Sequence, residues 1–164
     1  NLLLTDPIIR LAELYLNYAE AANEAYGPDG RAGGLPMTAL DAVNKVRNRA
    51  GMPDVLDKFT GSAPLLRERI RNERCVELAF EGHHYYHDIR RWKIAEKVMT
   101  DAHGLDVSKL QYYPSSGATS PYWQYEEIVI DKRSFNKDRD YLWPIPLKEL
   151  NANPLIRDDQ NPGY

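Results

Sequence analysis

The amino-acid sequence predicts an all-α fold made of a helical hairpin and further helices, with long irregular loops and at most a short β-hairpin. Three observations support this prediction. Apolar residues recur at helical spacing in three long stretches, clusters of glycine and proline separate these stretches, and the clearest strand-like pattern is short, at residues 126–131. With 164 residues, the chain is long enough for one domain with a hydrophobic core of its own.

The first predicted helix spans residues 7–26. Pro7 suits its first turn, and Asp6 is a candidate N-cap. One face is apolar and is expected to lie in the core, namely Ile8, Leu11, Ala12, Tyr15, Ala19, Ala22 and Tyr26. The alanines on this face allow another helix to approach closely. The sequence G-P-D-G at 27–30 ends the helix.

The second predicted helix spans residues 38–50, and Gly51 marks its end. Thr38 and Asp41, three residues apart, resemble a capping box. Arg47 shares the apolar face of this helix, so it is a candidate partner for carboxylates that lie inside the fold. The two helices together predict a hairpin over residues 7–51, of the kind that helical-repeat proteins stack.

Residues 64–100 predict a pair of helices separated by Gly82, the second of which continues to Met99. The first helix carries an apolar stripe made of Leu66, Ile70 and Phe80. Glu73 and Glu77 project into the same stripe, where an isolated charge is strongly unfavourable. These glutamates must therefore line a polar cleft or be held by arginines from elsewhere in the fold.

The second of these interpretations is favoured, because E-R-x-x-E surrounded by arginines is typical of a structural ion network. The predicted network comprises Arg47, Glu73, Arg74, Glu77, Glu81, Asp88, Arg90 and Arg91. The competing interpretation makes Glu73 and Glu77 the two carboxylates of a glycoside hydrolase. Residues four apart on a helix can place two carboxyl groups at the separation that such enzymes use.

His83, His84 and His87 lie beside these carboxylates and raise a metal-site hypothesis. His83 and His87 have the i,i+4 spacing of a zinc-binding pair, but H-E-x-x-H is absent and no pattern supplies a third ligand. We therefore predict packing or hydrogen-bonding roles for the histidines, and neither a metal nor another cofactor. Cys75, the single cysteine, is predicted to lie on the helix surface.

Residues 101–164 predict loops, the short strand at 126–131, and an extended tail that enters a short helix at P-I-P-L-K-E-L. Aromatic side chains gather around a Ser/Gly/Pro centre and form the predicted ligand-binding surface, namely Tyr112, Tyr113, Tyr122, Trp123 and Tyr125. Flat rings stack on the apolar faces of sugars, and tyrosine and tryptophan also serve contacts with proteins.

The net charge of −3 argues against nucleic acid or an anionic membrane surface as a partner, because both require a basic face. No apolar run approaches the roughly 20 residues that a membrane-spanning helix needs.

Three blocks of the sequence carry a family resemblance: P-I-I-R-L-A-E-L-Y-L-N-Y-A-E-A-A-N-E at 7–24, E-R-C-V-E-L-A-F-E-G-H-H-Y-Y-H-D-I-R-R-W at 73–92, and L-W-P-I-P with the terminal Q-N-P-G-Y. In this order they resemble the SusD/RagB family of nutrient-capturing outer-membrane lipoproteins, whose signature has the form E-R-x-x-E-L-x-x-E-G-x-R-x-x-D-L-x-R-W. His84 stands at the signature's arginine, and His87 is an extra residue before Asp88.

The resemblance implies a tetratricopeptide-like hairpin and a non-enzymatic function: binding of extracellular glycan at the outer face of the cell outer membrane, for delivery to a SusC-like TonB-dependent transporter. It also implies that residues 1–164 form the C-terminal domain of a longer chain, whose N-terminal part carries the lipid anchor. Within this domain, 7–51 is the hairpin, 64–100 the signature helix pair, and 101–164 the aromatic loops and tail.

Three alternatives stand beside glycan binding. A peptide is the alternative ligand within the family. Two further alternatives lie outside the family. One is a glycoside hydrolase that uses Glu73 and Glu77, and the other is a helical scaffold that binds protein alone.

Overall fold

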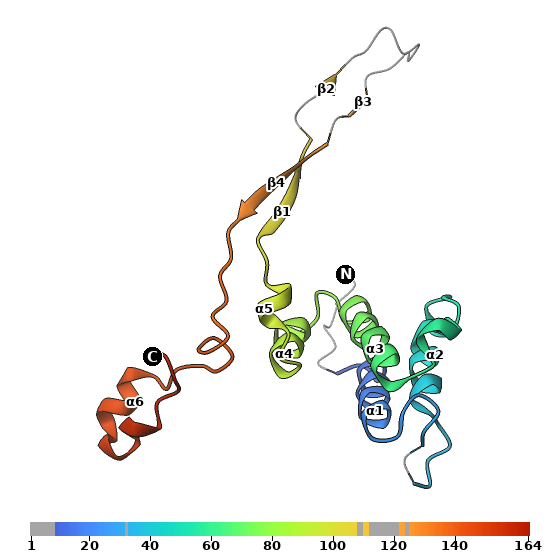
Figure 1. The fold of residues 1–164 in the computed structure, drawn as a ribbon, viewed down its shortest axis with the longest axis horizontal. Coiled ribbons are helices and arrows are strands. Elements are labelled where there is room, and N and C mark those ends of the chain that lie inside the picture. Colours follow the sequence, from blue (N-terminus) through green and yellow to red (C-terminus); the bar gives the residue numbers. More distant parts are fainter. Residues whose placement is uncertain (1–8, 32, 108–109, 112–121, 124) are drawn as a thin grey trace, which may run out of the picture. The chain divides into compact units, whose positions relative to one another are not determined.

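The computed structural model describes residues 9–31, 33–107, 110–111, 122–123 and 125–164 of the chain. The chain divides into two compact units, Asn1–His87 and Asp88–Tyr164, each of which is described by itself below. As predicted, the described residues are mostly helical, and their strands form only short antiparallel pairs (Figure 1). No helix within these ranges is long and apolar enough to cross a membrane.

Three helices make up most of the first unit: α1 (Leu11–Tyr26), α2 (Ala39–Arg49) and α3 (Ala63–Glu77), with a short 3₁₀ helix, η1 (Asp57–Phe59), before α3. Helix α1 packs against both α2 and α3 (Figure 1). The main core consists largely of small side chains, namely Ala19, Ala22, Ala39, Ala42, Val43, Val55, Leu66 and Ile70. Because half of this set is alanine, the helix backbones can approach one another closely.

The stripe that helix α1 turns toward the core agrees in part with the predicted one, because Ala12, Ala19 and Ala22 are buried as predicted. Leu11 and Tyr26 are 64% and 57% exposed, whereas Leu16 and Asn23 are fully buried. The helix carries apolar residues around most of its circumference, so the apolar pattern alone defines its inner face poorly. The small alanines decide which stripe can lie against α2 and α3.

The N-terminal end of α1 also differs from the prediction. The predicted start at Pro7, with Asp6 as its cap, lies outside the described residues. Ile9 and Arg10 are not helical, so a continuous helix from residue 7 is wrong. Arg10 occupies the N-cap position in an extended conformation, with φ −113° and ψ 152°. This conformation directs its side chain away from the first turn of the helix.

Helix α2 begins with the predicted capping box. The Thr38 hydroxyl accepts a hydrogen bond from the Asp41 amide at 3.0 Å, and the Thr38 amide donates to the Asp41 carboxylate at 2.9 Å. These bonds to Thr38, the backbone bond first, lower the pKa of Asp41. The predicted stop is confirmed as well, since Gly51 follows the C-cap with a φ of 72° that side-chain-bearing residues rarely adopt.

Helix α3 ends earlier than predicted. Its C-cap, Leu78, is buried, whereas Phe80 is fully exposed. Leu66 and Ile70 lie in the core as expected, but Phe80 does not continue their stripe. The φ of Phe80 is 64°, a strained conformation for a bulky residue, and it turns this side chain out of the helix.

Two short helices follow, α4 (His84–Arg91) and α5 (Ala95–Val98). Gly82, with a φ of 43°, separates α3 from α4, which confirms the predicted break. The prediction of one continuous helix up to Met99 is wrong, because Lys93 has a φ of 53° and interrupts it.

The strands belong to the second unit. β1 (Ala102–Asp106) pairs with β4 (Glu126–Asp131), and β2 (Leu110–Gln111) pairs with β3 (Tyr122–Trp123), in both cases antiparallel. The predicted strand at 126–131 is thus confirmed, whereas the loop predicted before it contains three strands. The Ile130 side chain lies over Gly104, where a Cβ atom would come within 2.2 Å of it.

The tail contains the predicted short helix, α6 (Leu147–Ala152), followed by the 3₁₀ helix η3 (Pro154–Asp159). The Gln160 side chain accepts a hydrogen bond from the Ile145 amide at 2.8 Å and donates to the Ile145 carbonyl at 3.1 Å. Asn161 donates to the carbonyl of Trp143. The end of the chain therefore satisfies the backbone of the extended W-P-I-P segment, whose prolines cannot take part as donors.

We predict that Thr38→Ala lowers the free energy of unfolding by about 1 kcal/mol, because it removes the side-chain acceptor of the capping box. Urea denaturation at neutral pH measures this loss. Thr60→Ala is the matched control, since the Thr60 hydroxyl makes an exposed hydrogen bond to Asp57, and it should cost less than about 0.5 kcal/mol. Equal losses in the two variants would contradict a stabilising cap.

Candidate functional site

The carboxylate of Glu77, at the end of α3, contacts two arginines. Arg10 Nη1 donates to Glu77 Oε1 at 2.8 Å, and Arg49 Nη2 donates to the same oxygen at 2.7 Å. Arg10 also donates to the backbone carbonyl of Glu77 at 2.7 Å and, through Nε, to the Glu81 carboxylate at 2.7 Å. Its hydrogen bonds to Glu81 and Glu77 raise the pKa of Arg10, so its guanidinium stays charged.

A second ion pair lies deeper in the same unit. Arg47 Nη1 and Glu73 Oε2 are 2.7 Å apart, and only about a tenth of each side chain is exposed. Arg47 Nε donates to the carbonyl of Pro53 at 2.8 Å. Next to Glu73 on α3, Arg74 Nη1 donates to Asn17 Oδ1 of α1 at 2.6 Å. Both α1 and α2 are thereby connected to α3 by charged hydrogen bonds, which are stronger than neutral ones.

The remaining members of the predicted network lie in the second unit. Arg91 Nε donates to the buried Asp88 carboxylate at 2.8 Å. The Arg90 guanidinium lies 5.7 Å from the centre of the Phe135 ring, within cation–π range.

Sequence reasoning placed Arg47 and Glu73 in one network, and the structure pairs them. It did not name Arg10 or Arg49, which bind Glu77. Arg10 lies 67 residues before Glu77, and no periodicity links residues that far apart. The one available signal is that Arg10 lies in the first of the three blocks quoted above.

These contacts bear on the glycosidase hypothesis. A general acid must hold a proton near neutral pH, which an apolar environment favours. Glu73 and Glu77 instead accept hydrogen bonds from arginines at 2.7 to 2.8 Å, so their carboxylate oxygens are engaged within the fold. The ion pairs that Glu73, Glu77 and Glu81 make with Arg10, Arg47 and Arg49 connect separate segments of the first unit, and we call them the clamp.

The predicted ligand-binding aromatics are described only in part. Tyr112 and Tyr113 lie outside the described residues. The backbone of Tyr122 and Trp123 forms β3, opposite Gln111 and Leu110 of β2. Tyr125 follows directly, just before β4, and its side chain is exposed.

The three histidines have separate environments. His83 is exposed, with a φ of 60°. His84 Nδ1 lies 3.9 Å from the Glu13 carboxylate, and the ring of His87 packs edge-on against Tyr86. Within the described part of the chain, no group of three or more His, Cys, Asp or Glu side chains is arranged to hold a metal ion.

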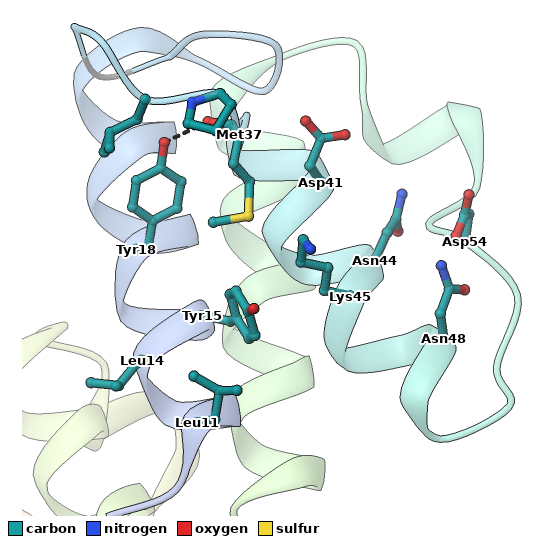
Figure 2. A pocket seen from close by; sticks show the side chains of 12 residues that line it. Leu11, Leu14, Tyr15, Tyr18, Met37, Asp41, Asn44, Lys45, Asn48 and Asp54 are labelled. Atoms are coloured by element: carbon teal, nitrogen blue, oxygen red, sulfur yellow. Dashed lines mark hydrogen bonds between the residues drawn. The ribbon is translucent and has the colours of Figure 1, made fainter.

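A hollow of about 810 Å³ lies between α1 and α2 (Figure 2). One wall comes from α1 and is mainly apolar, with Leu11, Leu14, Tyr15 and Tyr18. The other comes from α2 and is polar, with Asp41, Asn44, Lys45 and Asn48. Residues 35–37 and Asp54 complete the lining. Sequence reasoning missed this site, because each wall resembles an ordinary helix face until the fold brings the two together.

Hydrogen bonds hold the hollow's lining in place. The Tyr18 hydroxyl donates to the carbonyl of Met37, which ties the 35–37 segment to α1. Asn44 Oδ1 accepts from the Val55 amide at 2.9 Å and so orients the Asn44 side chain. Lys45 Nζ lies 5.6 Å from the centre of the Tyr15 ring, so a cation stands beside the apolar wall.

Comparison with known proteins gives consistent matches. The family model described as the SusD family matches residues 5–164. SusD-like protein P25 of Formosa agariphila is 31% identical over 160 residues, which cover 96% of this chain and 24% of that protein. SusD-like protein P2 of the same organism is 30% identical, with coverage of 95% and 25%.

A solved structure is also similar. The crystal structure of a SusD-like carbohydrate binding protein from Bacteroides fragilis matches with a TM-score of 0.61 and 34% sequence identity, covering 91% of this chain and 28% of that one. The chain therefore spans about a quarter of the length of the proteins that it matches.

We predict that Arg10→Lys lowers the free energy of unfolding by about 2 kcal/mol, because lysine retains the charge but cannot make the three hydrogen bonds of the guanidinium. Chemical denaturation provides the measurement. Arg67→Lys serves as the matched control, since Arg67 pairs with Glu24 at the surface, and it should cost less than about 1 kcal/mol. An Arg10→Lys protein as stable as this control would show that the clamp contributes little.

Proposed function

The chain belongs to the SusD family, and from this premise we propose that the protein captures extracellular glycan without chemical change and delivers it to a SusC-like TonB-dependent transporter. The observation that carries the proposal is the likeness, in sequence and in structure, to the carbohydrate binding protein from Bacteroides fragilis. That likeness extends over most of the chain, so it covers both compact units.

A non-catalytic function agrees with the state of the carboxylates. Glu73 and Glu77 are the residues that would serve a hydrolase, and both are bound to arginines. Their oxygens accept hydrogen bonds from arginines of other segments of the chain. Their role in this proposal is to hold α1, α2 and α3 together.

The proposed ligand contacts lie on the aromatic segment, with Tyr112, Tyr113, Tyr122, Trp123 and Tyr125. Flat aromatic rings offer an apolar surface to the C–H faces of sugars, and the tyrosine hydroxyls can bond to sugar hydroxyl groups. The exposure of Tyr125 supports this role, because an aromatic ring of a binding platform must be open to the ligand.

The proposed place of action is the extracellular face of the outer membrane, where a capture protein and a TonB-dependent transporter can exchange their ligand directly. Nucleic acid is not among the proposed partners, because the chain has 24 acidic and 21 basic residues and thus no excess of positive charge.

We predict that the protein binds a polysaccharide or its oligosaccharides, and that Tyr113→Ala, Tyr122→Ala and Trp123→Ala each weaken binding about tenfold, the loss expected for one stacking contact. Isothermal titration calorimetry against a glycan panel measures the affinities. Tyr26→Ala is the control, because Tyr26 is an exposed tyrosine at the end of α1. Unchanged affinity in all three variants would exclude the aromatic segment, and binding to peptides alone would exclude glycan as the ligand.

We further predict that Glu77→Gln reduces stability by about 2 kcal/mol, because two arginines lose their charged acceptor. Neither the wild-type protein nor the variant should release reducing sugar from any glycan that the protein binds. A wild-type protein that hydrolyses its glycan, together with a folded but inactive Glu77→Gln variant, would establish an enzyme instead.

A further inference from the structure

The aromatic segment is divided between the two arms of one β-hairpin. Tyr112 and Tyr113 follow β2 on the outgoing arm, whereas Tyr122, Trp123 and Tyr125 come before β4 on the returning arm. Strands β1 and β4 lie side by side and join both arms to the rest of the second unit (Figure 1). The pairing of β1 with β4 therefore helps to determine which residues of the two arms stand opposite each other.

The pair formed by β2 and β3 is too short to define the register by itself. Each of these strands has only two residues, and even a longer two-stranded hairpin is marginally stable in water. β1 and β4 have five and six residues, and they place Asp106 opposite Glu126, which directly follows Tyr125. The register of the hairpin thus depends mainly on β1 and β4.

An irregularity marks the register of the longer pair. Ala102 stands opposite Asp131, whereas the next residue of β1, His103, stands opposite Val129. Ile130 is therefore an extra residue on β4, which is the arrangement of a β-bulge. A bulge fixes the register, because a strand that slipped by one residue would have to form the bulge at a different residue.

Gly104 lies next to the bulge. The Ile130 side chain lies over it, and a Cβ atom at position 104 would come within 2.2 Å of that side chain. Any other residue at position 104 would thus force Ile130 to move. A slip of one residue turns every side chain of a strand to the opposite face, so it would reorient Glu126 and the adjoining Tyr125.

Two polar contacts connect the strands on either side of the bulge. His103 Nδ1 and Glu127 Oε1 are 2.8 Å apart, and the Arg133 amide donates to the Asp101 carboxylate at 3.1 Å. Cross-strand pairs of this kind stabilise an antiparallel ribbon. All of these contacts lie within one hairpin, so they do not depend on which of its faces is open to solvent.

We propose that Gly104 and Ile130 are positioning residues for the ligand-binding aromatics: they hold β1 and β4 in one register and thereby set the two arms of the aromatic segment opposite each other. The proposal rests on the proposed function, because it assumes that the aromatic segment binds glycan. Neither residue needs to contact the ligand. Their contribution is preorganisation, because a ligand that finds the arms already in register does not have to order them.

Preorganisation has a reciprocal consequence. If the register of β1 and β4 favours binding, the bound glycan must stabilise that register by the same factor. The backbone amides of β1 and β4 should therefore exchange with solvent about fivefold more slowly when the wild-type protein is saturated with ligand. Hydrogen exchange followed by NMR measures this change and requires no variant.

The variants are tested by isothermal titration calorimetry on the complete protein, with maltohexaose, cellohexaose, xylohexaose and mannohexaose as probes. For the oligosaccharide that binds, Gly104→Val should weaken the affinity about fivefold, because the ligand must then order the hairpin itself. The double variant Gly104→Val and Ile130→Gly should restore the affinity to within about twofold of wild type, since one large and one small residue again share the space. Gly61→Val is the matched control and should change nothing, because a Cβ atom at position 61 meets nothing within 4 Å.

The outcomes separate this inference from the proposed function. If the wild-type protein binds a probe but Gly104→Val binds it equally well, or the double variant fails to restore binding, the positioning role is wrong while the proposed function stands. Unchanged amide exchange in β1 and β4 on binding would overturn the role even where Gly104→Val does not fold. If neither the probes nor any polysaccharide binds to the wild-type protein, the proposed function fails and this inference fails with it.

Discussion

The hydrogen bonds of Arg10 constrain the first unit more than any other single interaction. One guanidinium at the start of α1 binds the Glu77 carboxylate, the Glu77 carbonyl and the Glu81 carboxylate, while Arg49 of α2 donates to the same Glu77 oxygen as Arg10. Removing such charges from water is unfavourable, and the penalty is offset only where the donors and acceptors match. A shift of α1 along α3 would break all three bonds of Arg10 at once, so the clamp fixes the register of the helices as well as their proximity. It also binds the backbone where α3 ends, beside the turn that exposes Phe80.

The clamp indicates that the charged residues of the signature have a structural role. A signature rich in glutamate, arginine and histidine looks like an active site, yet its carboxylates are bound to arginines and its histidines do not share a ligand cluster within the described residues. The signature glutamates that pair with these arginines are therefore assigned a structural role. The proposed ligand contacts belong to other residues, on the aromatic segment that ends at Tyr125.

The sequence was informative where the physics is local. The capping box at Thr38, the stop at Gly51, the strand at 126–131 and the break at Gly82 each depend on a few neighbouring residues, and all are present. The predictions failed where the outcome depends on distant segments. Arg10 binds a residue 67 positions away, and β1 is a strand because β4 lies beside it. The inner face of α1 was predicted correctly at its alanines but not beside them, because packing against α2 and α3 buries Leu16 and Asn23 rather than Leu11 and Tyr26. The hollow was beyond sequence reasoning for the same reason: its two walls belong to different helices, and either wall alone is unremarkable in sequence.

The proposed function, capture followed by delivery, requires binding that is tight enough to concentrate the ligand and weak enough to release it. Each hydrogen bond from an exposed polar side chain contributes only about 1 kcal/mol, because it replaces a bond to water. Stacking on an exposed aromatic ring adds contact area but no directional bond. Affinities between millimolar and micromolar correspond to only about 4 to 8 kcal/mol in total, which a few such contacts can supply. Exchange is then fast, because dissociation rates rise as affinity falls. A buried, charge-assisted site like that of Glu77 would bind too firmly and release too slowly, so the proposed function assigns the strongest interactions to the clamp and weaker ones to the ligand.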